Sequence, residues 1–294
     1  MLSRGRTSVV SAAGVLVVLA AVGFTLGRSP HETVVARVET VSAPAAPSAP
    51  APAPADEGPA VDPTSYDLAA LPSVDVFSVL PELPLDPAPD LPPTQVLVTP
   101  TGEAAPVFAE PGSPPVARLA SEQVHDGTTV PVVEQHEHWL RVLLPGRQGY
   151  PSAGVTGQAT GWVRAADVTT AADPFLVTVS LSGGLRILED GVAIYESPDL
   201  GYGTQATPTP LGRTFIMTMF TDPAAAYTRG LPIVALGVQS PTLDGFGGTD
   251  VAVTAFHFHD DRAQAVSNGC VRVDEATIAQ LAALPLGTPV VITA

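Results

Sequence analysis

The stretch Ser267-Asn268-Gly269-Cys270-Val271-Arg272 contains the only cysteine of this 294-residue chain. A single cysteine forms no internal disulfide and supplies no multi-cysteine metal site, so Cys270 is a packed thiol, an intermolecular bridge or a nucleophile. Two histidines, His257 and His259, lie shortly before it and offer a base for the thiol. Gly269 permits close approach of a ligand, and the nearby arginine favours the thiolate. These neighbours favour a nucleophile.

The composition of the whole chain limits the fold and the partners that it can have. The chain has 32 prolines, 26 glycines and a formal net charge of -16 at pH 7. Frequent proline and glycine favour short strands and turns over long helices. A nucleic-acid-binding protein needs a basic stripe, which this chain lacks, so nucleic acid is excluded as a partner. The length allows about two folded domains.

The N-terminal segment predicts a location. Arg4 and Arg6 precede residues 7–27, which carry no charge and are long enough for a transmembrane helix. Positive charge before the span favours a cytoplasmic N-terminus at residues 1–6. A cleaved signal peptide is the alternative, although its apolar region is usually shorter. We expect a membrane anchor, with the rest of the chain outside the cytoplasm in the cell envelope.

Residues 28–94 are rich in proline and alanine over much of their length. Sequences of this kind adopt an extended polyproline conformation and act as semi-rigid spacers. The range 80–93 contains a further proline-rich stretch that is unlike regular structure. We therefore predict a linker over residues 28–94.

Residues 95–170 contain short β-branched and aromatic runs separated by Pro-Gly turns, which predict a small β-barrel. A strand at residues 139–144, which begins with a tryptophan, is followed by a second strand at Gly161-Trp162-Val163. This pairing resembles bacterial SH3-like domains. His125, His136 and His138 lie in this range and are interpreted as exposed polar residues, with a metal site as the weaker alternative.

Residues 174–294 continue the pattern of short strands and predict a β-sandwich-like domain, so the whole chain is expected to be mainly β. One short helix is expected over residues 274–284, directly after the cysteine. Asp274 is its expected N-cap, and Ile278 and Leu281 lie on one face.

Two motifs of this C-terminal range resemble the L,D-transpeptidase (YkuD-type) catalytic domain. The hexapeptide at residues 267–272 is similar to the Ser-x-Gly-Cys-(Ile/Val)-Arg signature of that family. The run Thr207-Pro208-Thr209-Pro210-Leu211-Gly212-Arg213-Thr214-Phe215 is similar to its Thr-Pro-x-Pro-x-Gly-x-Phe element. The resemblance spans about residues 174–294 and implies a cysteine acyltransferase that acts on peptidoglycan.

The resemblance and the residue chemistry assign roles in the site. Cys270 is the expected nucleophile, and backbone N–H groups at Gly269 and Cys270 are expected to stabilise an oxyanion. The family's usual spacing for the base leads to Thr254, which cannot act as one, so the base is displaced in this chain. We predict His257 as the base, with Thr254-Ala255-Phe256-His257 interpreted as the displaced element. His259, which would lie on the same face of the strand, is the alternative.

The other predicted substrate-binding residues are His259, Ser267, Asn268, Gly269 and Arg272. Arg272 can hold a substrate carboxylate, and an ordinary surface ion pair is its alternative role. Paired metal ligation by the two histidines is the weaker interpretation, so neither a metal nor another cofactor is expected.

By resemblance, the substrates are peptidoglycan stem peptides, and inhibition by carbapenem β-lactams is expected. Transpeptidation would cross-link two stem peptides, whereas a carboxypeptidase would use water as the acceptor. A catalytically inactive wall-binding protein is the alternative from another class, motivated by the displaced histidine. A sortase-like enzyme is weaker still, because its Thr-Leu-x-Thr-Cys motif is missing.

Overall fold

The structure of the protein is a computed structural model that describes residues 58–294. The predicted cytoplasmic N-terminus, the predicted membrane segment at residues 7–27 and the first part of the predicted linker lie outside these residues. Within residues 58–294, no helix is both long and apolar enough to cross a bilayer. Strands dominate the described chain and only one α-helix is present in it, which confirms the mainly β prediction.

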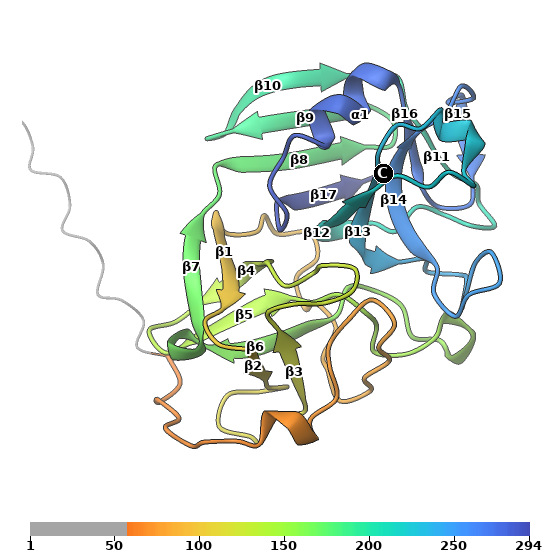
Figure 1. Ribbon diagram of the computed structural model, residues 1–294. Helices are drawn as coiled ribbons and strands as arrows, with labels where there is room; N and C mark the ends of the chain where they lie inside the picture. The colour runs from red at the N-terminus through yellow and green to blue at the C-terminus, as the bar shows by residue number, and fades with distance from the viewer. Residues whose placement is uncertain (1–57) are drawn as a thin grey trace, which may run out of the picture. The chain divides into compact units, whose positions relative to one another are not determined.

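An N-terminal module, residues 58–172, contains the first seven strands (Figure 1). Five of them form an antiparallel sheet in the order β6-β5-β4-β1-β7, and β2 pairs with β3. Their bounds are β1 Val96–Pro100, β2 Ala104–Val107, β3 Ala117–Ala120, β4 Val130–Gln135, β5 Trp139–Leu143, β6 Thr160–Arg164 and β7 Val168–Ala172. Three 3-10 helices belong to the module: η1 Leu68–Ala70, η2 Pro151–Ala153 and η3 Ala165–Asp167. The strands expected here are present, while the SH3-like assignment stays a prediction.

Residues 58–94 differ from the expected linker. Val74 and Leu83 are buried in the core of the module. Trp139 of β5 donates its indole N–H to the carbonyl of Ala60 at 2.8 Å. Asp86 forms a buried ion pair with Arg213 of the C-terminal part, with 2.7 Å between carboxylate and guanidinium. The sequence suggested a spacer because its apolar residues are scattered among prolines and show no strand or helix period.

The C-terminal part, residues 173–294, contains ten strands in the order β10-β9-β8-β17-β12-β13-β14-β16-β11-β15. The first residues of β12 pair with β17 in one sheet and its last residues pair with β13 in a second, so β12 joins the two, and the β-sandwich-like arrangement stays a prediction. The bounds are β8 Phe175–Ser180, β9 Gly184–Glu189, β10 Val192–Ser197, β11 Gly201–Gly203, β12 Gly212–Phe220, β13 Ile233–Gln239, β14 Val253–Phe258, β15 Gln264–Ser267, β16 Val271–Val273 and β17 Pro289–Thr293. A 3-10 helix, η4 Ala226–Thr228, follows β12.

The expected helix is confirmed as α1, Glu275–Leu281. The Asp274 carboxylate caps it by accepting the backbone N–H of Thr277 at 2.7 Å. Ile278 and Leu281 are fully buried in the core of the C-terminal sheet. The helix thus fixes the chain directly after the cysteine and β16.

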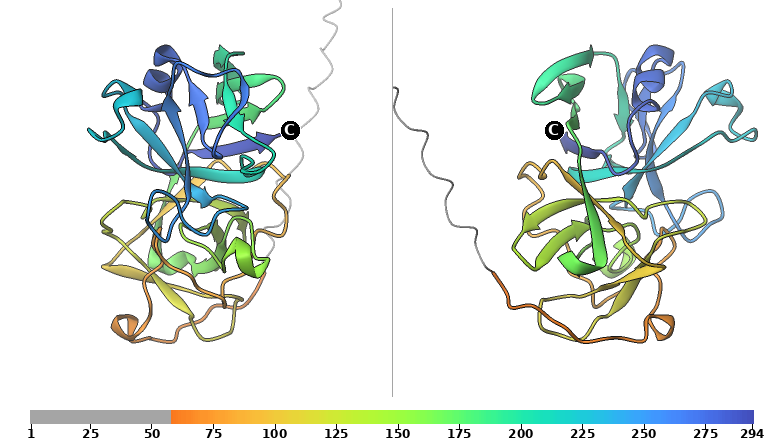
Figure 2. Two further views of the ribbon diagram at one scale, coloured as in Figure 1. Left: turned by 90° about the vertical axis from the view of Figure 1, so that its right-hand side faces the viewer. Right: turned by 60° about the vertical axis from the view of Figure 1, so that its left-hand side comes forward.

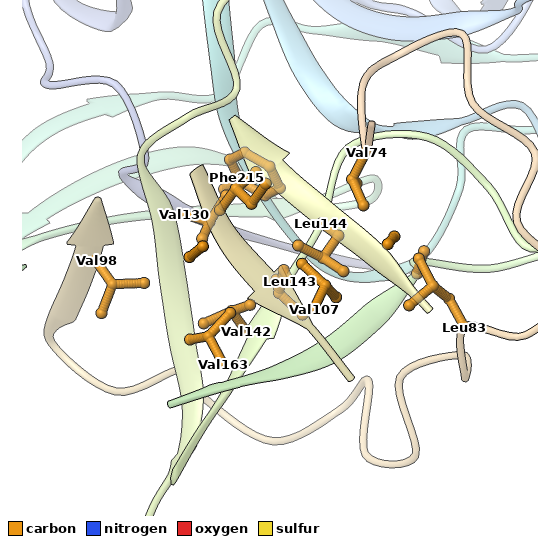
Figure 3. Packing of buried hydrophobic residues seen from close by; sticks show 14 of the residues in the cluster. Val74, Leu83, Val98, Val107, Val130, Val142, Leu143, Leu144, Val163 and Phe215 are labelled. Atoms are coloured by element: carbon orange, nitrogen blue, oxygen red, sulfur yellow. The ribbon is translucent and has the colours of Figure 1, made fainter. Parts of the chain in front are cut away.

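The module and the C-terminal sheet share a hydrophobic core. Phe215 and Met217 of β12 and Ala235 of β13 belong to the same buried cluster as the module residues. Figure 3 shows the Phe215 ring beside Val130 of β4 and among the valines and leucines of the module. Both views of Figure 2 place the C-terminal sheet directly against the module. Burial of these apolar side chains stabilises both parts together.

Candidate active site

Cys270 lies between β15 and β16, beside strand β14. Strands β14 and β16 pair in parallel, with Phe256 opposite Val271 and His257 opposite Arg272. Side chains two residues apart on a strand point to the same face. His257, Arg272 and Cys270 are therefore presented on one face of two adjacent strands.

A cavity of about 200 Å³ lies on this face. The structure brings all seven predicted site residues together around it. The full lining is Tyr227, Ser240, Leu243, Phe246, Ala252, Val253, Thr254, His257, His259, Ser267, Asn268, Gly269, Cys270 and Arg272.

The loop that carries the cysteine, residues 267–270, is fixed by its own serine. Ser267 Oγ donates to the Cys270 carbonyl at 2.6 Å and accepts the Gly269 N–H at 3.1 Å. Gly269 has a φ of 116°, a backbone conformation that residues other than glycine rarely adopt. Ser267 is buried, so its hydroxyl organises the loop, and Gly269 N–H is already engaged. Asn268 is exposed at the rim of the cavity.

The Thr-Pro element holds the same loop from the outside. Thr209 Oγ1 donates to the Gly269 carbonyl at 2.9 Å and accepts the Gly203 N–H at 2.9 Å. Thr207 Oγ1 donates to the Ser267 carbonyl at 3.3 Å. The two motifs are far apart in the sequence, and these bonds give a physical reason for finding them together.

His257 is buried and its tautomer follows from its neighbour. Its Nδ1 lies 2.9 Å from the carbonyl oxygen of Phe258. A carbonyl only accepts, so Nδ1 carries the proton and Nε2 is left as a bare acceptor. Burial lowers the pKa of His257, and the charges of Arg272 and His259 lower it further, while the Phe258 carbonyl opposes them. The neutral ring is therefore favoured, which is the form that accepts a proton.

His259 has the opposite arrangement. Its Nδ1 accepts the backbone N–H of Asp261 at 3.0 Å. The proton of the neutral ring is thus on Nε2, which can donate but not accept. The centroids of the two imidazole rings lie 6.2 Å apart. Of the two histidines, only His257 has an unprotonated ring nitrogen that is not already accepting a hydrogen bond, so only His257 is suited to act as a base.

The Cys270 thiol is partly buried beside these groups. Burial raises the pKa of the thiol, and the Ala255 backbone N–H and the Arg272 charge oppose this in part. A raised thiol pKa together with a lowered imidazole pKa favours the neutral pair over a thiolate–imidazolium pair. Attack by the sulfur then requires transfer of the thiol proton to a base.

A comparison with protein families covers this part of the chain. Residues 174–292 match the sequence model of YkuD, the L,D-transpeptidase catalytic domain. This part of the chain belongs to that family. Every predicted site residue lies within the matched range.

Solved structures of L,D-transpeptidases resemble the chain over part of its length. One from Mycobacterium smegmatis is 14% identical, with 53% of this chain and 91% of that chain covered and a TM-score of 0.32. One from Stackebrandtia nassauensis is 20% identical, with coverages of 42% and 57% and a TM-score of 0.31. The complex of an L,D-transpeptidase, LdtMt1, with imipenem is 15% identical, with coverages of 53% and 91% and a TM-score of 0.31. No curated protein sequence matches the chain.

Arg272 of the L,D-transpeptidase domain is only partly engaged. Its Nη1 donates to the Asp261 carbonyl at 3.1 Å and lies 3.5 Å from the Asp261 carboxylate. Its Nε is buried and has no hydrogen-bond partner among the described residues. An incompletely paired guanidinium on the cavity wall suits a substrate carboxylate or carbonyl.

Tyr227 is a cavity residue that sequence reasoning missed. Its ring centroid lies 5.1 Å from that of His257 and 5.6 Å from that of His259. Burial raises the pKa of Tyr227, and the neighbouring Cys270 and Asp222 add to this, so the phenol keeps its proton. Tyr227 follows β12 in η4 and belongs to no motif, which left it without a sequence signal.

Leu243 and Phe246 were also missed. Both lie in the loop between β13 and β14 and line the cavity. Two apolar side chains in a Gly-rich loop are a signal in the sequence that could have predicted a substrate-binding loop here.

None of the module's histidines belongs to the lining of this cavity. His136 lies 3.0 Å from the Glu134 carboxylate and stacks on Trp162 at 5.6 Å. Across residues 58–294, no group of three histidine, cysteine, aspartate or glutamate side chains is arranged to hold a metal ion.

Proposed function

We propose that the chain is a peptidoglycan L,D-transpeptidase that cross-links stem peptides through a thioester on Cys270. The observation that carries this proposal is the bare Nε2 of His257 in the cavity of Cys270, on the strand that pairs with β16. The family of residues 174–292 supports the substrate class.

In the first half-reaction, His257 Nε2 takes the Cys270 proton as the sulfur attacks the carbonyl that follows the L-centre of diaminopimelate. The carbon–nitrogen bond to the terminal D-alanine then breaks. Its nitrogen leaves with the proton returned by His257, and the donor peptide remains on sulfur as a thioester.

In the second half-reaction, a side-chain amine of an acceptor stem peptide attacks the thioester. His257 takes a proton from this amine, the new amide forms, and the cysteine sulfur leaves and regains the proton. The neutral pair favoured by the site is the starting state of each turnover.

We assign the Cys270 N–H as an oxyanion donor, because the Gly269 N–H is already bound to Ser267 Oγ. Arg272 is assigned to a substrate carboxylate. Asn268, exposed at the rim, and the Nε2–H of His259 are assigned to hydrogen bonds with the bound peptide.

Peptidoglycan lies outside the cytoplasmic membrane, so the catalytic domain is placed in the cell envelope. Residues 7–27 are proposed as the anchor that holds it there. Carbapenem acylation of Cys270 is expected, and one of the similar structures is a complex of an L,D-transpeptidase with imipenem.

The proposal is tested by incubating the full chain with purified monomeric muropeptides that carry a tetrapeptide stem and analysing the products by mass spectrometry. Cross-linked dimers and released D-alanine are expected. Release of D-alanine without dimers would replace the proposal with a carboxypeptidase. Absence of both, together with no carbapenem adduct on Cys270, would replace it with a catalytically inactive wall protein.

A further inference from the structure

The loop between β13 and β14, residues 240–252, is here called the cavity loop. Its residues Ser240, Leu243 and Phe246 line the cavity of Cys270. The middle of the loop contains Gly247 and Gly248, with φ values of 64° and 87°. A glycine-rich backbone of this kind has many accessible conformations, so contacts outside the glycines must set its position.

Gln239, the last residue of β13, joins both ends of the cavity loop to the module. Its Oε1 accepts the N–H of Ala252, at the other end of the loop, at 3.2 Å. The same oxygen accepts a hydrogen bond from Arg147 Nη2. Its Nε2 donates to the Val76 carbonyl at 2.9 Å. One buried amide thus connects the loop ends to two separate segments of the module.

Arg147 lies in the loop between β5 and β6 and is only 5% exposed. Its side chain donates to an amide oxygen and lies 5.1 Å from the centroid of the Tyr150 ring. The Asp244 charge acts on it, but none of the ion pairs among the described residues includes Arg147. Its Nη1 is buried without a hydrogen-bond partner in the described chain, and burial lowers the pKa of Arg147. A buried cation without a carboxylate is a poor way to gain stability, which indicates another role.

The middle of the cavity loop is held by the same module segment. The Asp244 carboxylate accepts the backbone N–H of Ser152 at 3.0 Å. Hydrogen bonding by the Ser152 side chain, and then by its backbone N–H, lowers the pKa of Asp244, and the charge of Arg147 adds to this. The loop is therefore held at both ends and near its centre.

We propose that the β5–β6 loop of the module is a positioning element of the substrate cavity. Arg147 and Ser152 hold the cavity loop so that Leu243 and Phe246 form the wall against which the stem peptide binds. The module thereby sets substrate fit without contributing a residue to the cavity lining. This inference rests on the proposed function for its substrate, and on the contacts alone for the position of the loop.

Two substitutions in the full chain test this role. Arg147→Met removes the donors and keeps the length of the side chain, and Asp244→Ala removes the acceptor for Ser152. We expect faster amide hydrogen exchange confined to residues 240–252. We expect kcat/KM on muropeptides to fall by about ten- to a hundredfold, because a misplacement of about 1 Å costs about that much. The change should be mainly in KM, since Cys270 and His257 keep their own anchors.

Three matched variants serve as controls. Asp244→Asn keeps an oxygen that can accept the Ser152 N–H and should restore wild-type KM and exchange. Asp250→Ala removes an exposed carboxylate from the same loop, and Arg186→Met removes a 63% exposed guanidinium on β9. Both should behave as wild type.

Unchanged exchange of residues 240–252 in folded Asp244→Ala, or a loss in kcat with unchanged KM, would overturn the inference. If Arg147→Met does not fold, Asp244→Ala and Asp244→Asn still decide it. An inactive wild-type chain would instead refute the proposed function. In that case, the exchange of the cavity loop alone decides whether the module positions it.

Discussion

The Cys270 loop and the cavity loop border the same cavity but are held in different ways. Ser267 and Thr209 fix the Cys270 loop, and both belong to the motifs of the catalytic domain. The cavity loop has its own hydrogen bonds at Ser240, but its position relative to the module is set by Ser152 directly and by Arg147 through Gln239. The comparison teaches that the chemistry of the site is built inside one domain, while the shape of its cavity depends on the other.

The largest effect is expected at the nucleophile in the Cys270 loop. Cys270→Ser should lower kcat by at least about 10³-fold, because loss of the nucleophile removes the covalent route. The measurement is the rate of dimer formation, with thermal unfolding as the control for folding. A variant that keeps more than a tenth of the wild-type rate would contradict the role of Cys270.

The second largest effect is expected at one of the two histidines of the catalytic domain, and comparing the two variants identifies the base. His257→Ala should reduce kcat by about 10²- to 10⁴-fold, the usual contribution of a general base. His259→Ala, which removes a ring without a bare nitrogen, should cost less than about tenfold. The initial rates of the two variants give the ranking, and the reverse order would assign the base to His259.

The next effect is on stability and concerns the hydrophobic core that the module shares with the C-terminal sheet. Phe215→Ala should lower the free energy of unfolding by about 3–5 kcal/mol, because it empties a fully buried aromatic position. Phe220→Ala on the same strand, where the side chain is 47% exposed, should change it by less than about 1 kcal/mol. Denaturant unfolding of the full chain measures both. Separate transitions for module and catalytic domain in the wild type would show that the core is not shared.

The sequence allowed prediction of the parts whose signals are local. Cys270 and the Asp274 cap of α1 were predictable because each depends on a short motif. Val74 and Leu83 were not, because their burial depends on contacts made far along the chain. Arg147 and Tyr227 share this difficulty, since strand order and register bring them to their partners. The base was predicted as His257, and the tautomers now give a chemical reason for that choice.

Thr209→Val tests how strongly the Thr-Pro element holds the Cys270 loop. The substitution keeps the shape but leaves the Gly203 N–H and the Gly269 carbonyl without this partner. We expect a loss of about 1–3 kcal/mol in stability and a lower kcat. Thr209→Ser keeps the hydroxyl and is the matched control. Equal unfolding free energies for the two variants would show that these hydrogen bonds do not hold the loop.

The smallest effect is a shift in the pH dependence. Turnover needs neutral His257, whose pKa is held below its ordinary value of 6.5. Activity should therefore be half-maximal on the acid side at a pH below 6.5, as the ring gains a proton. His259→Gln removes one charge that lowers this pKa, so its acid limb should move to higher pH. Profiles of kcat/KM for both chains measure this, and an acid limb with its midpoint above pH 6.5 in the wild type would contradict it.

The most direct test of the central claim is peptide mass spectrometry of the acyl-enzyme. The full chain is mixed with a stem tetrapeptide and quenched in acid within the first turnover, before the amine of a second peptide resolves the thioester. The account predicts that the peptide containing Cys270 carries the donor tripeptide as a thioester, with one D-alanine released per adduct, and that His257→Ala forms this adduct far more slowly. D-Alanine release with no adduct on Cys270, or equal adduct formation in His257→Ala, would contradict it.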